Sequence, residues 1–201
     1  MELNEIHMDF LKEIGNIGAG NAATSLSNML SKRIEMNVPK VSLLDYNDIV
    51  DSIGGAENVL VGVLIGFEGD IEGLILFLLK KEFVHLVLNS LMGTELKGFE
   101  EIGELELSAL SEISNIMVSS YVNSISTLTN MKINITTPSL NIDMAGALLD
   151  AVTAEFAEVA DKVVFIKEKY YCQNETAHSY MLLLPTMSSL KTLLKKFGID
   201  I

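Results

Sequence analysis

Apolar residues recur along the chain with two different periods, which predicts a mixture of helices and strands. In the first 33 residues they are mostly three or four positions apart, the spacing of an amphipathic helix, and Asn4 is its expected N-cap. A turn around residues 35–39 then leads to the short apolar run VSLLDY, which predicts a strand with Pro39 at its start or edge, since proline cannot donate to a sheet ladder. Residues 46–57 indicate a short helix or a loop.

Two stronger apolar runs follow, at residues 58–67 and 71–80. The residues between them, Glu68-Gly69-Asp70, have the composition of a turn, so the pair predicts an antiparallel hairpin. Strands as continuously apolar as these are usually buried on both faces or against helices. Residues 82–92 then predict a short amphipathic helix that ends before Gly93.

The second half of the chain repeats this order of elements. The polar stretch 94–104 is the expected join, and residues 105–129 predict a second long helix. The elements expected after it are a strand at 131–140 that contains Pro138, an alanine-rich helix at 142–160, strands at 162–171 and 177–184 with a turn near Asn174-Glu175, and a last helix at 188–197.

Polar residues on the two long helices repeat as well. In each helix three of them stand at i, i+4 and i+7, which places them on one face over about two turns. A single match of this kind is typical of a solvated helix face, but here a proline also follows at the same distance in both halves. The repeat consists of Asp9, Glu13, Asn16 and Pro39 in the first half and of Ser108, Glu112, Asn115 and Pro138, each 99 residues later, in the second.

This duplication predicts the fold class. We expect a single α/β (α+β) domain over residues 1–201, made of two repeats, 1–93 and 105–201, that are joined by 94–104 and related by a pseudo-two-fold axis. About six β-strands would form the core, flanked by the two long helices that carry the repeated residues, here called the motif helices, and by shorter helices. Each motif helix would turn its polar face outward.

The composition of the chain argues against several classes of function. A chain of 201 residues that is 49% apolar, with a net charge of −13, is typical of an ordered globular protein, and it lacks the clustered lysines and arginines that a nucleic-acid partner would require. No apolar run reaches about 18 residues without a charge, and the N-terminus lacks the pattern of a secretory signal, so we expect no membrane insertion. The single cysteine, Cys172, favours a reducing cytoplasm, and the scattered histidines predict no metal site.

A glycine-rich run in the first motif helix raises the question of nucleotide binding. Residues 18–23, GAGNAA, fit the pattern G-x-G-x-x-[G/A], and Asp45 ends the next strand, where a ribose-binding acid would stand. That fingerprint requires a buried strand directly before the glycines, whereas the preceding residues have a helical period and the second repeat has no glycine there. We therefore expect no nucleotide site.

The glycines then have two other interpretations. Gly20 and its counterpart Ser119 are both small, so each can leave space beside the motif asparagine for the approach of another protein. Alternatively, Gly15, Gly18 and Gly20 allow close packing between helices, at a cost in helix stability of about 1 kcal/mol each.

The chemistry of the repeated glutamate and asparagine points to a site that another protein completes. An amide offers both a donor and an acceptor, which can hold a water molecule in a fixed geometry, and a carboxylate can pair with a lysine. Neither group is a nucleophile, and no histidine–carboxylate pair accompanies them, so a self-contained hydrolase is not favoured. The water-positioning amide of GTPases and of their activators is a physical precedent for such a shared site.

The pattern E-x-x-N followed by 22 residues and proline, with Asp or Ser four positions before the glutamate, occurs twice and resembles the CheC family of chemotaxis phosphatases. The resemblance extends over essentially the whole chain. The related CheX proteins carry one such site in a shorter chain, and FliY proteins carry further domains at both ends, so the chain is most similar to the two-site CheC type.

The resemblance implies the activity, the partners and the roles of the residues. Each motif helix would dock on the phosphorylated receiver domain of CheY, whose phospho-aspartate would be hydrolysed, and the chain itself would bind no cofactor because the Mg²⁺ would belong to CheY. The implied roles are water orientation for Asn16 and Asn115, pairing with the receiver lysine for Glu13 and Glu112, support for Asp9 and Ser108, and shaping of the motif for Pro39 and Pro138. Because Asp9 and Ser108 differ, equal activity of the two sites is left open.

Proteins of this family also bind the receptor deamidase CheD. The alanine-rich insert 143–160 is the largest departure from the repeat symmetry, so we expect it to dock a CheD-type partner, with Asp143, Met144, Leu148 and Asp150 as candidate contacts. The alternative interpretation is a covering helix whose Met144, Leu148, Leu149 and Val152 belong to the core. For the whole protein, the alternative function is a non-enzymatic adaptor that binds a CheD-type deamidase, phosphorylated CheY or both.

Overall fold

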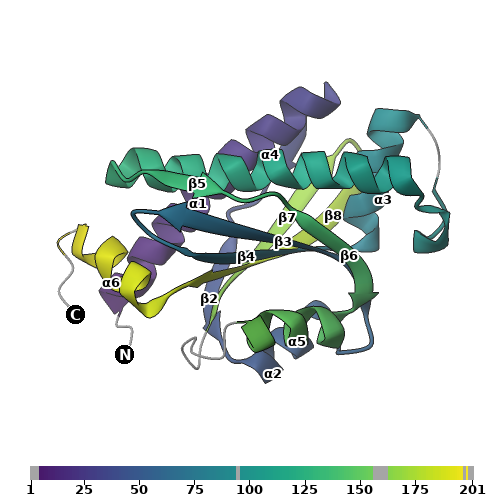
Figure 1. The fold of residues 1–201 in the computed structure, drawn as a ribbon. Helices are drawn as coiled ribbons and strands as arrows, with labels where there is room; N and C mark the ends of the chain where they lie inside the picture. Colours follow the sequence, from purple (N-terminus) through teal and green to yellow (C-terminus); the bar gives the residue numbers. More distant parts are fainter. Residues whose placement is uncertain (1–4, 94–95, 156–162, 197, 199–201) are drawn as a thin grey trace.

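The computed structural model describes residues 5–93, 96–155, 163–196 and 198, and it shows one antiparallel sheet with helices on both faces (Figure 1). The helices are α1 (Glu5–Leu30), α2 (Tyr46–Ile53), α3 (Lys81–Met92), the short 3₁₀ helix η1 (Phe99–Glu101), α4 (Glu104–Thr129), α5 (Ala145–Glu155) and α6 (Met187–Lys196). The strands are β1 (Ile34–Met36), β2 (Lys40–Leu44), β3 (Val59–Gly69), β4 (Gly73–Leu79), β5 (Ile133–Ile135), β6 (Ser139–Met144), β7 (Val163–Cys172) and β8 (Glu175–Pro185).

The sheet interleaves strands from the two halves of the chain. Its order is β1-β7-β8-β4-β3-β5, and in addition β2 pairs with β7 while β6 pairs with β3. The two predicted hairpins, β3–β4 and β7–β8, meet at the centre, where Phe77 lies opposite Met181. The short strands of each half therefore pair with the hairpin of the other half, so neither half can complete its part of the sheet alone.

The prediction of about six strands was right for the positions in the sheet and wrong for the number of strands, because each edge position holds two short strands. Strand β1 was not predicted, and β5 and β6 replace the single strand predicted over 131–140. Pro39 stands between β1 and β2, and Pro138 stands between β5 and β6. Proline has no N–H for the ladder, so the edge strand is interrupted at the same place in both halves.

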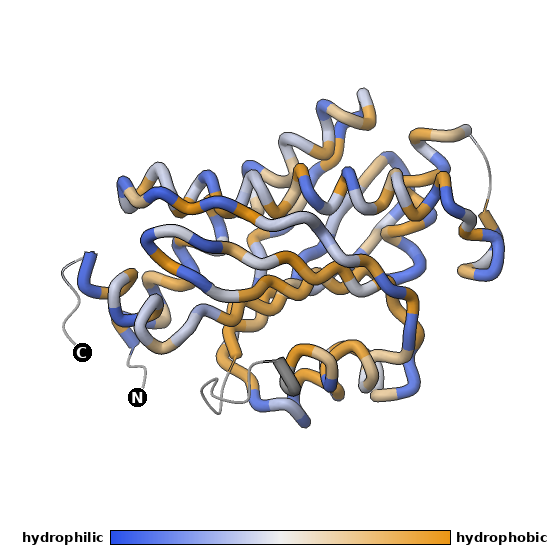
Figure 2. Tube along the Cα trace, viewed as in Figure 1, coloured by the Kyte–Doolittle hydropathy of each residue, from blue (hydrophilic) through white to orange (hydrophobic). Residues whose placement is uncertain are grey.

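Two hydrophobic cores lie on the two faces of this sheet. The larger core is formed by the inward faces of α1, α3 and α4 with alternate residues of the strands, and the smaller one lies under α2 and α5. In Figure 2 the central strands are the most hydrophobic part of the trace, as expected for strands covered on both faces. The structure thus confirms helices over a buried sheet.

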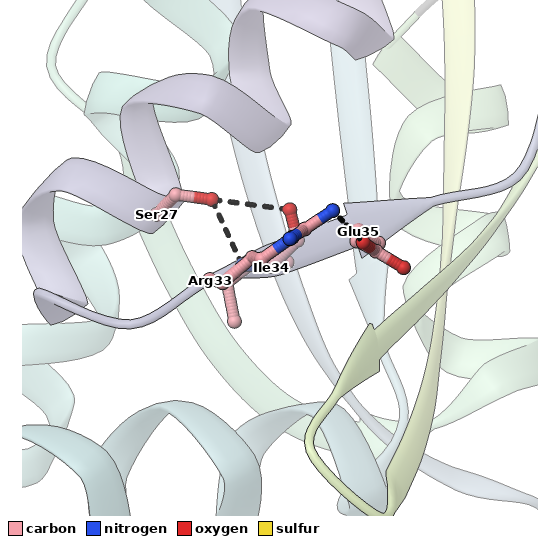
Figure 3. Close-up of polar contacts among 4 residues, drawn as sticks. All are labelled: Ser27, Arg33, Ile34 and Glu35. Carbon is pink, nitrogen blue, oxygen red and sulfur yellow. Dashed lines mark hydrogen bonds and ion pairs between the residues drawn. The ribbon is translucent and has the colours of Figure 1, made fainter.

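The C-terminal turn of α1 is tied directly to the first edge strand (Figure 3). The Ser27 hydroxyl accepts a hydrogen bond from the Ile34 N–H at 3.1 Å and donates to the Ile34 carbonyl at 3.2 Å. Arg33 and Glu35 form an ion pair at 2.5 Å, but both side chains are mostly exposed, so it stabilises the fold little. The serine hydroxyl thus links the end of the helix to the backbone of the strand.

The motif helices α1 and α4 cross as an antiparallel pair. Asn21 donates to the Ser124 hydroxyl at 2.8 Å, and the Ser25 and Ser120 hydroxyls are bonded at 2.8 Å. Exchanging the two halves, by a shift of 99 residues, converts the first contact into the second. These reciprocal contacts confirm that a pseudo-two-fold axis relates the motif helices.

A buried polar cluster anchors α4 to the sheet. The carboxylate of Glu168, on β7, is completely buried and accepts hydrogen bonds from the hydroxyls of Tyr121, Tyr170 at 2.7 Å and Ser179 at 2.5 Å. Burial raises the pKa of Glu168, although the three hydroxyl donors act in the opposite direction. Burial, together with the nearby Glu168 carboxylate, also raises the pKa of Tyr121 and of Tyr170 well above the usual value.

The alanine-rich helix is shorter than predicted. Residues 142–144 belong to β6, and α5 begins at Ala145. Asn4, residues 94–95, residues 156–162 and Phe197, which were part of the predicted cap, join and helices, lie outside the described residues. Among the helices that the structure describes, none is long and apolar enough to cross a membrane.

Candidate functional site

The three polar residues of the first motif lie on the outer face of α1. Asp9 and Glu13 are exposed and Asn16 is half-buried, whereas the neighbouring Leu11 and Ile14 are buried in the core. Residues three apart on a helix have Cβ atoms about 5–6 Å from each other, so the Glu13 carboxylate and the Asn16 amide can act on one partner.

The second motif has the same arrangement on α4. Ser108 and Glu112 are exposed and Asn115 is half-buried. Within the described part of the chain, no hydrogen bond or ion pair engages the side chains of Glu13, Asn16, Glu112 or Asn115. Two carboxylates and two amides therefore face solvent with their hydrogen-bonding capacity available to another molecule.

The two sites differ in the residues next to the glutamate. Asp9 forms an ion pair with Lys12 at 3.0 Å, with side-chain exposures of 75% and 53%. In the second copy the corresponding residues are Ser108 and Ser111. The first site thus carries a salt bridge where the second carries two hydroxyls.

The proline of each motif lies at the break in the edge strand, and β2 after the first break packs against its motif helix. A Cβ atom at Gly15 would lie 2.7 Å from Cγ2 of Val41, so the absence of a side chain at Gly15 lets β2 approach α1 directly before Asn16. The backbone N–H of Asn37 donates to Lys169, and in the other half Thr136 donates to Gly66. The shaping role of Pro39 and Pro138 stays a prediction.

The two sites are well separated. The reciprocal contacts place the helix crossing near residue 23 of α1 and residue 122 of α4. Asn16 and Asn115 each precede the crossing by about seven residues on antiparallel helices, which puts them roughly 20 Å apart along the axes. They form two sites rather than one composite site.

The glycine-rich run lies wholly inside α1, so the strand that a dinucleotide fingerprint requires is absent from its place. Asp45 has a different role, since its carboxylate accepts the Asp48 N–H at 2.9 Å and caps α2. Gly18 packs against the ring of Tyr121 on α4, which confirms close packing between helices for this residue, whereas Gly15 packs against Val41 of a strand. At Gly20 a Cβ would meet nothing within 4 Å, so the surface beside Asn16 is open there.

The four candidate contacts for a CheD-type partner do not share one environment. Met144 is 49% exposed and lies opposite the equally exposed Val59, while Leu148 is buried against Gly62. Leu148 is therefore a core residue and the prediction that it contacts a partner was wrong for this conformation. The alternative interpretation is correct for Leu148, Leu149 and Val152, which are buried in the core, and wrong for Met144.

The two aspartates among these candidates have local partners. The Asp143 carboxylate accepts the Met144 N–H at 2.7 Å, and Asp150, on the exposed side of α5, accepts the hydroxyl of Tyr46 from α2 at 2.8 Å. The hydrogen bond to Asp150 is the main cause that raises the pKa of Tyr46. The accessible part of the predicted docking element is thus Met144 with Asp150.

In the described residues no group of three or more His, Cys, Asp or Glu side chains is arranged to hold a metal ion. Cys172 is buried on β7. The expectation that this chain binds no cofactor stays a prediction.

Three features beside the motifs escaped the sequence analysis. Ile6, which fits the apolar period of the first helix, is 64% exposed, and Leu105 is 70% exposed. The third is Ser114, the neighbour of Asn115, whose buried hydroxyl has no hydrogen-bond partner in the part of the chain that the structure describes. The shift of 99 residues that relates the motifs also relates Ile6 to Leu105, and this signal is present in the sequence.

Comparison with known proteins agrees with the repeated motif. The model of the CheC-like family matches residues 6–43 and 105–142, the two stretches that contain both motifs. The CheY-P phosphatase CheC of Bacillus subtilis (strain 168) is 29% identical over 200 residues, which cover 98% of this chain and 96% of that protein. The crystal structure of Thermotoga maritima FliY matches with a TM-score of 0.78 and 28% identity over 98% of both chains. The FliM middle domain from H. pylori, with a TM-score of 0.71 and 13% identity over 96% of this chain and 99% of that one, shares the fold alone.

Proposed function

We propose, from the similarity to the CheC-like family, that the chain hydrolyses the phospho-aspartate of a phosphorylated CheY-type receiver. The proposal depends on two solvent-facing Glu–Asn pairs at matched positions of the two motif helices. No hydrogen bond or ion pair within the described residues involves these side chains. A relative that aligns with nearly the whole chain is named a CheY-P phosphatase.

In the proposed reaction each asparagine acts on the attacking water. The amide of Asn16 or Asn115 holds a water in line with the bond between phosphorus and the aspartyl oxygen. The water oxygen forms a bond to phosphorus, the aspartyl carboxylate leaves, and inorganic phosphate is released. Glu13 or Glu112 pairs with the receiver lysine and fixes the position of the water.

The remaining motif residues have supporting roles in this proposal. Asp9 and Ser108 adjust the polarity beside the glutamate, and Pro39 and Pro138 shape the strand break. In this proposal the Mg²⁺ belongs to the receiver. The cytoplasm, where a receiver of this kind acts, stays the predicted location.

A CheD-type deamidase is the proposed second partner. Its contact surface would be Met144 with Val59 and the outer face of α5 around Asp150, since these side chains are accessible and Leu148 is not. Helix α5 lies on the opposite face of the sheet from α1 and α4 (Figure 1), so both partners can bind at once.

The test of the proposed activity is the decay of phosphorylated CheY with the wild-type chain and with Asn16→Ala, Asn115→Ala and the double variant. Each single change should remove the activity of one site, and the double variant should leave the decay rate of CheY alone. Asn123→Ala, which changes an exposed asparagine of α4 outside the motif, is the matched control and should keep full activity. Unchanged phosphate release in the double variant would refute the mechanism.

The non-enzymatic adaptor gives a different result in the same assay. It predicts no acceleration of CheY-P decay by the wild-type chain, and asparagine changes that weaken binding only. Including a CheD-type partner in one arm separates an adaptor from an enzyme that needs this partner for full turnover.

A further inference from the structure

Two large apolar side chains stand in solvent at equivalent places in the two halves. Ile6 on α1 is 64% exposed and Leu105 on α4 is 70% exposed. The shift of 99 residues that relates the motifs also relates these two positions. A single exposed aliphatic residue is ordinary on a protein surface, but two at matched positions beside matched polar faces indicate a shared role.

The fold does not require either side chain to be apolar. Further along the same helices, Leu11 and Ile14 in α1 and Leu110 and Ile113 in α4 are buried and make the contacts with the core. Ile6 and Leu105 lie outside this buried set, so replacing them should change stability little.

Their place on the helix is continuous with the motif. Ile6 precedes Asp9 by three residues, Glu13 by seven and Asn16 by ten, and Leu105 precedes its own motif residues by the same numbers. These spacings keep all four side chains on one face. The helical rise puts Ile6 about 15 Å from Asn16 along the axis. A protein interface of ordinary size covers about 800 Å² on each partner, so a domain seated over Asn16 also reaches Ile6.

We infer that Ile6 and Leu105 are docking residues for the phosphorylated receiver, each burying its side chain against an apolar patch of the receiver at about this distance from the phospho-aspartate. The inference rests on the proposed function. The apolar contact supplies affinity and sets the register of the helix on the receiver, while the Glu–Asn pair acts at the phosphate. The acidic chain, with its net charge of −13, gains a contact that does not depend on charge.

The two sites allow a crossed test in which each serves as the control of the other. Asn115→Ala leaves only the first site active, and Asn16→Ala leaves only the second. In the Asn115→Ala chain, Ile6→Asn should raise the KM for phosphorylated CheY about tenfold and keep kcat within about twofold, because it removes binding that ground state and transition state share. Leu105→Asn should leave both constants unchanged in that chain, and the pattern should reverse in the Asn16→Ala chain.

Direct binding separates this inference from the proposed catalysis. CheY activated with beryllofluoride binds without hydrolysis, so calorimetric titration measures docking alone. The double variant Ile6→Asn/Leu105→Asn should lose about tenfold in affinity while its thermal unfolding stays that of the wild type. Equal affinity, or a kcat that falls while KM stays constant, would overturn the docking role. Unchanged hydrolysis in the asparagine variants would instead refute the proposed mechanism and leave the binding result to decide the docking role.

Discussion

The contact between Gly18 of α1 and Tyr121 of α4 permits a stability test with a matched control in the same helix. A Cβ atom at Gly18 would lie 2.2 Å from Cδ1 of the Tyr121 ring, whereas at Gly20, two residues on, it would meet nothing within 4 Å. The ring cannot retreat easily, because it is buried and its hydroxyl donates to Glu168. Alanine is favoured over glycine in a helix by about 1 kcal/mol, while overpacking a core costs about 1–3 kcal/mol.

Gly18→Ala should therefore lower the free energy of unfolding by about 2 kcal/mol, if the overpacking cost lies at its upper end, and Gly20→Ala should raise it by up to about 1 kcal/mol. Urea unfolding followed by circular dichroism measures both values, and the slopes should agree with the wild type. Tyr121→Leu removes the ring and should reduce the penalty of Gly18→Ala. If Gly18→Ala is as stable as Gly20→Ala, the helices do not cross as described.

Three further predictions concern single polar groups. Ser114→Ala should raise the free energy of unfolding by about 1 kcal/mol in urea titrations, since the buried hydroxyl has no partner in the described residues, whereas Ser179→Ala should lower it by at least that amount because Glu168 loses a donor. The raised pKa of Glu168 means that the folded state holds the Glu168 proton to higher pH than the unfolded state does. The wild type should therefore lose stability relative to Glu168→Gln as pH rises above the ordinary pKa of 4.5, by up to about 1.4 kcal/mol per pH unit. Unfolding curves at several pH values measure this difference, and a difference that does not change with pH would contradict the prediction. Lys12→Ser gives the first site the residue that Ser111 supplies in the second. It should change the free energy of unfolding in urea by less than about 0.5 kcal/mol, because the ion pair between Lys12 and Asp9 is exposed.

The helices and the two hairpins could be predicted because long segments carry their own period. The 26-residue helices α1 and α4 and the strands of the hairpins each repeat their pattern several times. Strands β1 and β5 have three residues each, which is too short to show a period. They form because their backbones pair with β7 and β3, respectively. Their discovery needs the partner strand, which the sequence does not place.

The same limit applies to groups of residues that only the sheet brings together. Glu168 stands between two lysines in the sequence, an arrangement typical of a solvated strand. In the fold its carboxylate is buried and accepts hydrogen bonds from hydroxyl groups on α4, β7 and β8, and the sequence does not show that these groups meet. Lys80 and Lys167 lie 5.6 and 5.7 Å from the ring centre of Tyr180, although no cluster of basic residues is visible along the chain. The prediction that nucleic acid is not a partner stays untested.

The candidate site was predictable because it needs only one helix and one repeat. Glu13 and Asn16 are neighbours by helical geometry alone, so their spacing already states their arrangement. What the fold adds is independence of the two copies. The antiparallel crossing holds both motif helices on one core and puts Asn16 and Asn115 roughly 20 Å apart along the helix axes. A change in either motif should therefore act on one site, while a change in the contact between the two helices, such as Gly18→Ala, should weaken both sites together through their common support.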